Sequence, residues 1–329
     1  MVAGKRLNAG GGSMESNKRE ENWERSVLER LALESIAEQR RRRRWGIFFK
    51  LLGFAYLSFV IYLAGDWSPS TDKLPVGKGY AAMVSVDGVI EAGGQAGAEQ
   101  VIAALQTAFA DRSVRGVVLR LNSPGGSPVQ AGMINDEIAR LRGTRPDLKV
   151  AAVIEDVCAS GGYYVAVAAD TIYVDKASLV GSIGVLMDSF GFVGTMEKLG
   201  VERRLLSAGE SKGFMDPFSP QRAEHLAHAR GLLDEIHQQF IEVVRKGRGD
   251  RLKEEPGMFS GLVWTGERSI ELGLADALGT VESVARDVFQ VEEVRDFTRR
   301  RNLAERFAQR FGADVAESMM GVLARINLR

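Results

Sequence analysis

Apolar and polar residues alternate along the middle of the chain in a pattern that predicts short buried strands and amphipathic helices. Runs of four to seven mostly apolar residues are typical of strands in a parallel sheet, and apolar residues three or four apart are typical of helices. Strands are expected over Tyr80 to Val86, Val117 to Leu121, Val150 to Ile154 and Thr171 to Val174; helices are expected over Gly97 to Ala110, from Ser127 onward, over Gly161 to Ala168, and from Ser219-Pro220 to about Arg245.

The helix after Ser127 has the clearest local signals. Ser127 with Gln130 three residues later forms a capping-box pattern, and Pro128 suits the first helical turn. Ile134, Ile138 and Leu141 then form its apolar stripe. Strand, helix and strand at this spacing imply right-handed βαβ crossovers, so we expect an α/β fold built on a mostly parallel sheet.

A different pattern precedes this region. Residues 45–64 are predominantly apolar with one charge, Lys50, and follow five arginines at Arg40 to Arg44. Twenty helical residues span about 30 Å, the thickness of the bilayer hydrocarbon core. We therefore expect one N-terminal transmembrane helix, a signal anchor, rather than a buried core helix or a cleaved signal peptide. The positive-inside rule places the arginines in the cytoplasm.

The predicted organisation has five parts. Residues 1–44 form a cytoplasmic, partly disordered segment, 45–64 the anchor, 65–78 a linker, 79–290 the exported catalytic domain and 291–329 a C-terminal helical extension. Within the first part, residues 21–40 are either a membrane-surface or partner helix or a solvated stalk. The last 33 residues, 297–329, are either a regulatory or oligomer contact or a helix packed on its own domain.

Composition narrows the function classes. The chain has 329 residues, of which 45% are hydrophobic and 26% charged, which is typical of a globular protein. Its 43 acidic residues balance 43 lysines and arginines, so no net charge points to nucleic acid. One cysteine, Cys158, excludes an intrachain disulfide and a cysteine-rich zinc site. We expect neither a metal nor another cofactor.

Two glycine-bearing loops follow buried strands, at the edge where α/β sheets place ligands. The first is residues 122–126, NSPGG, and the second is residues 158–164, CASGGYY. Ser160 would begin a helix whose unpaired backbone N–H groups could bind an oxyanion formed by its attack on a carbonyl. Gly125 or Gly126 could supply a further N–H. The alternative is two tight turns that need glycine only for their backbone conformation.

A serine nucleophile needs a base. The only histidines, at positions 225, 228 and 237, all fall on one predicted helix, and we interpret them as ordinary helix residues. Lys212 remains, within SAGESKGFMDPF, residues 207–218. A lysine can act as a base near neutral pH only if burial lowers its pKa by roughly 3 units, about 4 kcal/mol. An exposed loop lysine is the alternative. Cys158 is a rival nucleophile, but its position before the turn favours a buried and inert thiol.

These motifs resemble those of the signal peptide peptidase A (SppA) family, in its short, single-domain, membrane-anchored form. The resemblance covers about Gly79 to Val284 and includes LNSPGG, ASGGYYVA, GSIGV at 181–185, SAGESKGFMDPF and WTGERSIELGLADALG at 264–279. It implies a Clp-protease/crotonase-like fold. It also implies that Ser160 is the nucleophile, that Lys212 is the base, and that Gly161 with the Gly125–Gly126 loop forms the oxyanion hole. Ser182, in GSIGV, would lie beside the lysine. Ser269 departs from the family pattern, with consequences for packing alone.

The resemblance further implies a membrane-bound serine endopeptidase that forms a ring-like homo-oligomer and hydrolyses apolar peptides, such as remnants of cleaved signal peptides. It would be a single-pass protein of the inner membrane, with its catalytic domain on the outer, periplasmic face. Two alternatives use the same fold. One is a crotonase-like acyl-CoA hydrolase, which would need neither the anchor nor Lys212. The other is a non-catalytic membrane scaffold.

Overall fold

The computed structural model describes residues 40–59 and 79–299 of the chain. The predictions for residues 1–39, 60–78 and 300–329 lie outside this range. The chain divides into two units, Met1–Lys73 and Leu74–Arg329. In the first, residues 40–59 form one helix whose side chains are exposed. None of the helices in residues 40–59 and 79–299 combines the length and apolar character needed to cross a bilayer. Only part of the expected anchor, residues 45–59, falls within these residues.

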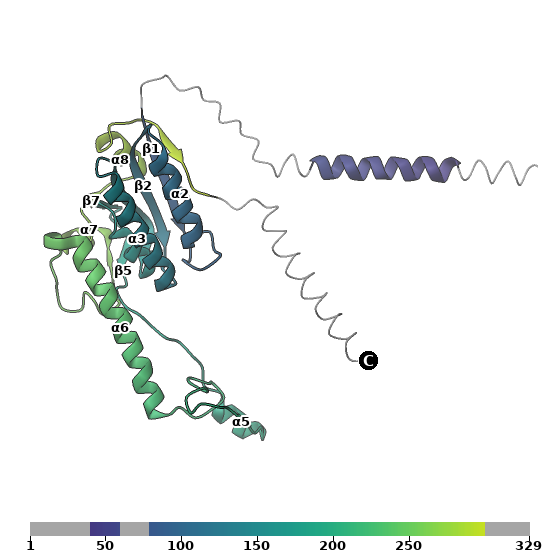
Figure 1. Cartoon of the computed structure of the whole chain (residues 1–329), viewed down its shortest axis with the longest axis vertical. Helices are drawn as coiled ribbons and strands as arrows, with labels where there is room; N and C mark the ends of the chain where they lie inside the picture. Colours follow the sequence, from purple (N-terminus) through teal and green to yellow (C-terminus); the bar gives the residue numbers. More distant parts are fainter. Residues whose placement is uncertain (1–39, 60–78, 300–329) are drawn as a thin grey trace, which may run out of the picture. The chain divides into compact units, whose positions relative to one another are not determined.

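The second unit is built on a mostly parallel sheet (Figure 1). Its main path runs in the order β6-β5-β3-β2-β1-β8, and β4 joins β3 to β7. Every pairing is parallel except that between β5 and β6. The strands are β1 (Tyr80–Asp87), β2 (Val114–Ser123), β3 (Lys149–Ala159), β4 (Thr171–Val174), β5 (Leu179–Gly181), β6 (Val263–Thr265), β7 (Ala277–Leu278) and β8 (Val294–Asp296). The α/β class predicted from the strand–helix alternation is confirmed.

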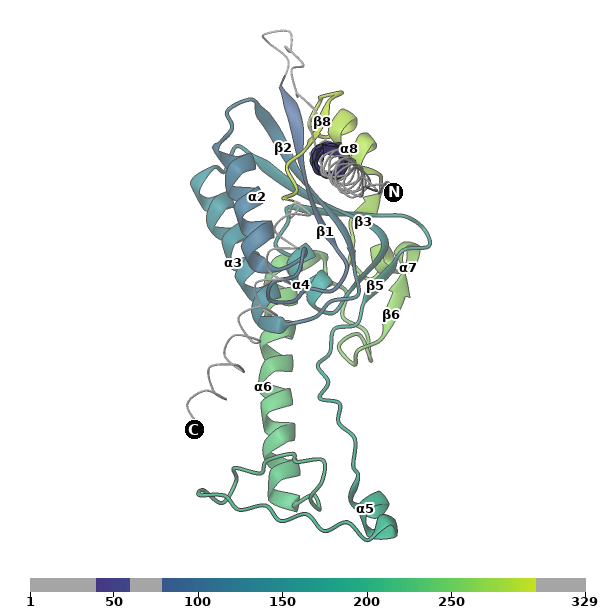
Figure 2. The ribbon, with the colours of Figure 1, turned by 90° about the vertical axis from the view of Figure 1, so that its right-hand side faces the viewer.

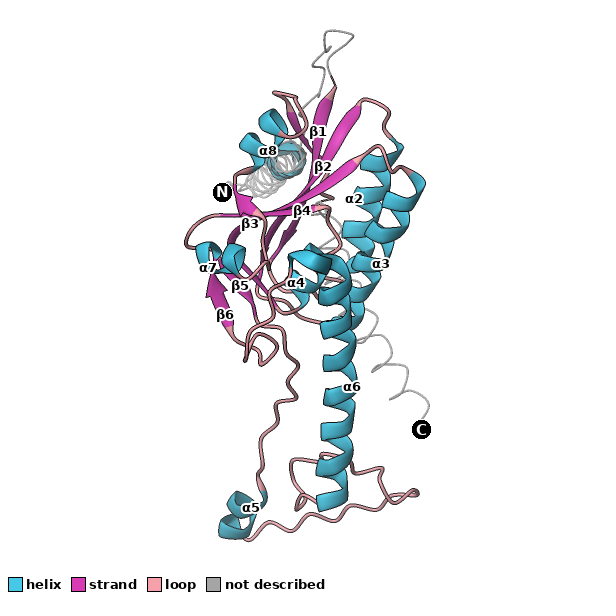
Figure 3. Ribbon diagram, turned by 90° about the vertical axis from the view of Figure 1, so that its left-hand side faces the viewer, coloured by secondary structure: helices cyan, strands magenta, loops and turns pink. Residues whose placement is uncertain are grey.

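Helices cover both faces of the sheet (Figure 3). On one side, α2 (Ala98–Ala110), α3 (Pro128–Thr144) and α4 (Gly161–Ala166) bury the larger apolar core against β1 to β3. On the other, α8 (Val281–Asp287) closes a smaller core around Val118 and Phe289. The remaining helices are α5 (Val193–Leu199), α6 (Ala223–Arg248), a short 3-10 turn (Gly249–Arg251) and α7 (Gly266–Glu271).

Local signals in the sequence set the start of α3. Ser127 is its N-cap and accepts a hydrogen bond from the Gln130 N–H, while Pro128 occupies the first turn. The reciprocal half of the predicted capping box does not form, because the Gln130 side chain accepts from the N–H of Ala98 on α2 instead. A contact with α2 therefore replaces the local hydrogen bond that the sequence pattern predicts for the Gln130 side chain at the start of α3.

Strand β3 pairs on one side with two different strands along its length. Residues 151–154 pair with β4, and after an irregular stretch residues 157–159 pair with β5. The opposite edge of the sheet extends past the predicted domain end at 290, because β8 pairs in parallel with β1 within the segment assigned to the C-terminal extension.

Candidate active site

Ser160 stands at the turn between β3 and α4. Its backbone has φ 52° and ψ −124°, and a positive φ of this kind is uncommon for any residue other than glycine. Its N–H donates to the Gly181 carbonyl at 2.8 Å, which fixes the turn against β5. A strained strand-to-helix turn of this kind projects a serine hydroxyl from the sheet edge in enzymes that use serine as a nucleophile. The Ser160 hydroxyl makes no hydrogen bond to another described residue.

The glycine loop after β2 packs directly on this turn. A Cβ placed on Gly125 would lie 2.7 Å from both the Ser160 Cβ and the Gly161 nitrogen. A Cβ on Gly126 would lie 2.2 Å from the Ile90 carbonyl oxygen. Both glycines have positive φ, 102° and 146°, which other residues rarely adopt. The structure therefore brings Gly125, Gly126, Ser160 and Gly161 together, and neither loop glycine can carry a side chain in this arrangement.

The backbone N–H groups of the two loops differ in availability. The Gly125 N–H is occupied by a hydrogen bond to the Ser123 hydroxyl at 3.1 Å. The N–H groups of Gly126 and Gly161 donate to no other described residue, and the Gly126 nitrogen lies 3.3 Å from the Cβ position of Gly161. Donors at neighbouring positions beside a serine hydroxyl are the groups that an oxyanion hole requires. Of the three predicted glycines, Gly126 and Gly161 are thus the available donors.

Ser182 lies on the other side of the Ser160 turn. Because Ala159 pairs with Gly181, the two serines that follow these residues are neighbours at the ends of adjacent parallel strands. Ser182 also has a positive φ, 51°, and its N–H donates to the Leu262 carbonyl at 2.7 Å. The structure therefore places Ser182 beside the candidate nucleophile.

Lys212 does not join this group within one chain. Two residues after it, Phe214 packs edge-on against His225 and His228 near the start of α6. The contact between α6 and α4 is made much further along, where Phe240 packs on Tyr164. The 12 residues from His228 to Phe240 correspond to about 18 Å of helix. Figure 2 shows the chain between α5 and α6 at the far end of α6 from α4.

The segment that carries Lys212 is an extended arm, residues 185–222, between β5 and α6 (Figure 3). Lys212 itself is exposed on it. So are many large apolar side chains, and Leu206 is 96% exposed. Exposed apolar surface on this scale is typical of an interaction surface. The exposed apolar residues of the arm are Leu186, Met187, Phe190, Phe192, Leu199, Val201, Leu205, Leu206 and Phe218.

The cysteine and the three histidines have the positions that the sequence predicts. Cys158 is fully buried, and burial raises the pKa of its thiol. This environment makes it inert as a nucleophile. His225 is buried, His228 is exposed, and His237 lies against the Ile183 carbonyl at 3.2 Å. All three belong to α6, as predicted.

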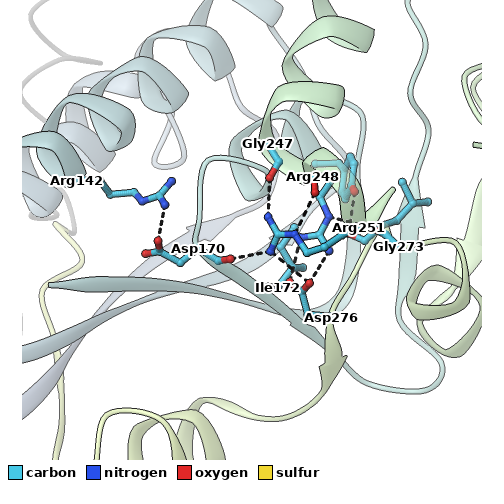
Figure 4. A network of polar contacts seen from close by, with 10 residues as sticks. Arg142, Asp170, Ile172, Gly247, Arg248, Arg251, Gly273 and Asp276 are labelled. Atoms are coloured by element: carbon cyan, nitrogen blue, oxygen red, sulfur yellow. Dashed lines mark hydrogen bonds and ion pairs between the residues drawn. The ribbon is translucent and has the colours of Figure 1, made fainter. Parts of the chain in front are cut away.

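A network of arginines and aspartates fixes the other end of α6 to the sheet (Figure 4). Arg248, which is 1% exposed, donates to the Gly273 carbonyl at 2.7 Å and makes two hydrogen bonds, at 2.7 and 3.0 Å, to Asp276. Burial alone would raise the pKa of Asp276, but the hydrogen bonds and charge of Arg248 lower it below its usual value. Arg251 and the Arg142–Asp170 pair extend the network.

Two further residues that sequence reasoning did not single out belong to the LNSPGG motif. The Asn122 side chain bridges β2 to the irregular stretch of β3 before Ser160, since it accepts from the Val157 N–H and donates to Asp156. Ser123, fully buried, bonds to the glycine loop. Two small polar residues at a strand end, separated from a glycine pair by one proline, were the signal that could have indicated these roles.

Comparison with known proteins shows similarity to one family of peptidases. Residues 144–295 match the model of peptidase family S49. A protein of Brucella abortus named Na(+)/H(+) antiporter NhaA is 45% identical over 185 residues, 56% of this chain and 25% of that protein. A Methanocaldococcus jannaschii protein named as a protease is 33% identical over 184 residues, 56% of this chain and 58% of that protein. The chloroplastic serine protease SPPA of Arabidopsis thaliana is 31% identical over 186 residues, 55% of this chain and 27% of that protein.

The chain therefore spans between a quarter and somewhat more than half of the length of these relatives. Most of the Brucella protein lies outside the match, and its antiporter name describes that protein alone. The residues that match the family model include both Ser160 and Lys212. Over residues 144–295 this chain is similar to peptidase family S49, and it is also similar to two proteins that are named as proteases.

Proposed function

We propose that this chain hydrolyses peptide bonds with Ser160 as nucleophile and Lys212 as general base. The observation that carries the proposal is the Ser160 turn. There a strained serine, with φ 52°, lies beside the two free backbone N–H groups of Gly126 and Gly161. Such strain persists only where the surrounding structure enforces it, and it is concentrated at functional sites.

The chemistry follows from these groups. Neutral Lys212 accepts the Ser160 proton as the serine oxygen attacks the peptide carbonyl. The Gly126 and Gly161 N–H groups stabilise the oxyanion of the tetrahedral intermediate. The protonated lysine then donates its proton to the leaving amine, which leaves an acyl group on Ser160. Water, deprotonated by the same lysine, hydrolyses this ester and restores the serine.

The base comes from a second copy of the chain. Within one chain the Lys212 segment is separated from the α4 region by about 18 Å along α6, too far for proton transfer. The exposed apolar arm offers a surface on which a neighbouring copy could pack. Burial in that contact would favour the neutral form that a lysine base requires. Repeated head-to-tail contacts of this kind close into a ring, the expected homo-oligomer.

Ser182 completes the proposed site. It stands beside Ser160 at the end of the adjacent strand, with its hydroxyl unpaired among the described residues. From there it can hold the ammonium of an incoming lysine in the orientation that proton transfer requires. Its removal should lower activity less than removal of either member of the dyad.

Substrates and location are inferred from the sequence. Residues 45–64, which follow Arg40 to Arg44, are proposed to anchor the chain in the inner membrane with the N-terminus in the cytoplasm. The catalytic domain would then face the periplasm. A peptidase held beside the bilayer is suited to apolar peptides such as remnants of cleaved signal peptides. The proposed role is therefore clearance of such peptides.

Two variants, compared with wild type, test this function. Wild type, Ser160→Ala and Lys212→Ala are assayed on an apolar fluorogenic peptide from neutral to alkaline pH, with folding checked by circular dichroism. Both folded variants should lose at least about a hundredfold in kcat/KM. An active Lys212→Ala variant would place the base elsewhere. An inactive wild type that is stabilised against heat by coenzyme A would favour the acyl-CoA hydrolase instead.

A further inference from the structure

The Ser123 side chain lies at the junction between the glycine loop and the chain that follows β1. Ser123 is fully buried, and its hydroxyl makes two hydrogen bonds. It accepts from the Gly125 N–H at 3.1 Å and donates to the Gly88 carbonyl at 2.6 Å. One hydroxyl thus uses its single proton and a lone pair to connect two backbone segments.

These segments also pair with one another. The Ile90 N–H donates to the Gly125 carbonyl, and the Ser127 N–H donates to the Ile90 carbonyl, both at 2.8 Å. Residues 88–90 therefore form a strap across the glycine loop. Its other end is held by the Gly88 N–H, which donates to the Asn122 carbonyl at 2.9 Å. The other hydrogen bonds named here join backbone groups, and Ser123 adds two bonds from its side chain.

The consequence concerns the next peptide unit. The Gly125 N–H turns back to Ser123, and the chain at Gly125 and Gly126 has two positive φ angles. In this conformation the Gly126 N–H, beside Gly161, has no partner among the residues that the structure describes. An alanine at 123 would leave the buried Gly125 N–H without an acceptor. An unsatisfied buried donor is unfavourable, so the loop would rotate toward another partner or toward water.

We propose that Ser123 is a positioning residue that orients the oxyanion-binding N–H of Gly126. This inference rests on the proposed function, since it assigns Gly126 to the oxyanion hole. Ser123 touches no substrate in this role. It acts by holding the loop so that the donor aims at the oxygen only when the carbonyl carbon becomes tetrahedral. Loss of the hydroxyl should therefore weaken transition-state binding more than binding of the substrate itself.

The competing explanation is that Ser123 is merely a small residue in a tight core. A Cβ on Gly162 would lie 3.3 Å from the Ser123 Cβ, so space at this position is limited. Under that explanation alanine, which is smaller, would be tolerated at little cost to catalysis. The two explanations predict different kinetics, which makes them separable.

The test compares Ser123→Ala with Ser269→Ala in the full chain. Ser269 is also fully buried, and its hydroxyl bonds to a backbone carbonyl, of Gly266 at 2.7 Å, on α7. Ser123→Cys, close to serine in volume but a weak hydrogen-bonding group, is a second variant in case alanine impairs folding. The readouts are kcat and KM on the fluorogenic peptide, and inhibition by a peptide aldehyde, whose hemiacetal oxygen occupies the oxyanion hole.

We expect Ser123→Ala and Ser123→Cys to lower kcat at least about tenfold and to weaken aldehyde inhibition in parallel, with KM changed less than about threefold. Removal of a whole oxyanion donor costs about 10²–10³ in kcat, so a misdirected donor should cost somewhat less. Ser269→Ala should match wild type. If folded Ser123 variants keep wild-type kcat and aldehyde affinity, the positioning role is refuted although the proposed function stands. If wild type itself shows no Ser160-dependent hydrolysis, both are refuted.

Discussion

Replacement of Arg248 by methionine should destabilise the α/β unit through the loss of one buried interaction. Arg248 is 1% exposed, and its guanidinium makes a bidentate contact with Asp276 and a third bond to the Gly273 carbonyl. Methionine keeps most of the apolar stem but removes the charge. Asp276 would then keep the Ile172 N–H and the more distant Arg251, 3.4 Å away, as partners.

The burial of Arg248 determines the expected loss in free energy of unfolding. Removal of one partner of a buried ion pair typically costs 3–5 kcal/mol, because the other charge is left without compensation. Since Arg251 remains near Asp276, we expect the lower value, about 3 kcal/mol. For a domain of this size each kcal/mol lowers Tm by about 2–4 °C, so Tm should fall by about 6–12 °C.

The assay is urea unfolding followed by tryptophan fluorescence, with Arg245→Met as the matched control. Arg245 lies on the same helix and forms the same bidentate contact, at 2.6 and 2.8 Å, with Glu254. That pair is about half exposed, and an exposed pair contributes about 1 kcal/mol or less. If Arg248→Met lost no more free energy of unfolding than Arg245→Met, burial would not determine how much the Arg248–Asp276 contact stabilises the domain, and the expected loss of about 3 kcal/mol would be refuted.

The contribution of Asp276 should also depend on pH in a defined direction. Its pKa is lowered in the folded chain, so the stabilisation is fully present above the unfolded value of about 3.9. It is lost as the pH falls through the lowered folded value, where the carboxylate takes up a proton. The difference in free energy of unfolding between wild type and Arg248→Met should therefore shrink in acid. A difference that grew in acid would contradict the assigned direction.

Two further outcomes follow from the active-site geometry. Gly126→Ala should fold with reduced stability and lose at least about tenfold in kcat. Its Cβ would lie 2.2 Å from the Ile90 carbonyl oxygen and would displace the loop. Full activity of this variant would show that the loop is not part of the oxyanion hole. Cys158 should resist iodoacetamide in the native chain and react once the chain is unfolded in urea, because it is buried and its thiol has a raised pKa. Alkylation is measured by mass spectrometry. Rapid alkylation of the native chain would show that the turn before Ser160 opens.

The sequence was most informative where local chemistry determines structure. Short apolar runs predicted the buried strands, and β4 has the bounds expected for it, Thr171–Val174. The stripe of Ile134, Ile138 and Leu141 is buried on α3 as predicted. The two glycine loops meet because parallel strands end at one edge of the sheet, which strand order along the chain already suggests. Fold class and the position of Ser160 follow from these features.

Other features depend on contacts between distant residues, and no local pattern encodes them. The arm and the direction of α6 decide where Lys212 lies, and both are set by packing such as that of Phe240 on Tyr164. The Arg248–Asp276 contact joins residues 28 apart in the chain and has no periodic signature. Gly126 rather than Gly125 is the available donor because the Gly125 N–H is bonded to Ser123, and no sequence pattern indicates that bond.

The proposed function requires Ser160 of one copy to act with Lys212 of another copy. Ser160→Ala and Lys212→Ala chains, each inactive alone, are mixed under conditions that let subunits exchange, and peptide hydrolysis is measured. A mixed assembly contains contacts in which an intact Ser160 meets an intact Lys212 from a neighbouring copy. Activity should return, up to about a quarter of the wild-type rate for equal random mixing of the two chains at such contacts. If subunits exchange and the mixture stays as inactive as its components, Ser160 and Lys212 do not act across the contact between two chains, and the proposed shared dyad is refuted.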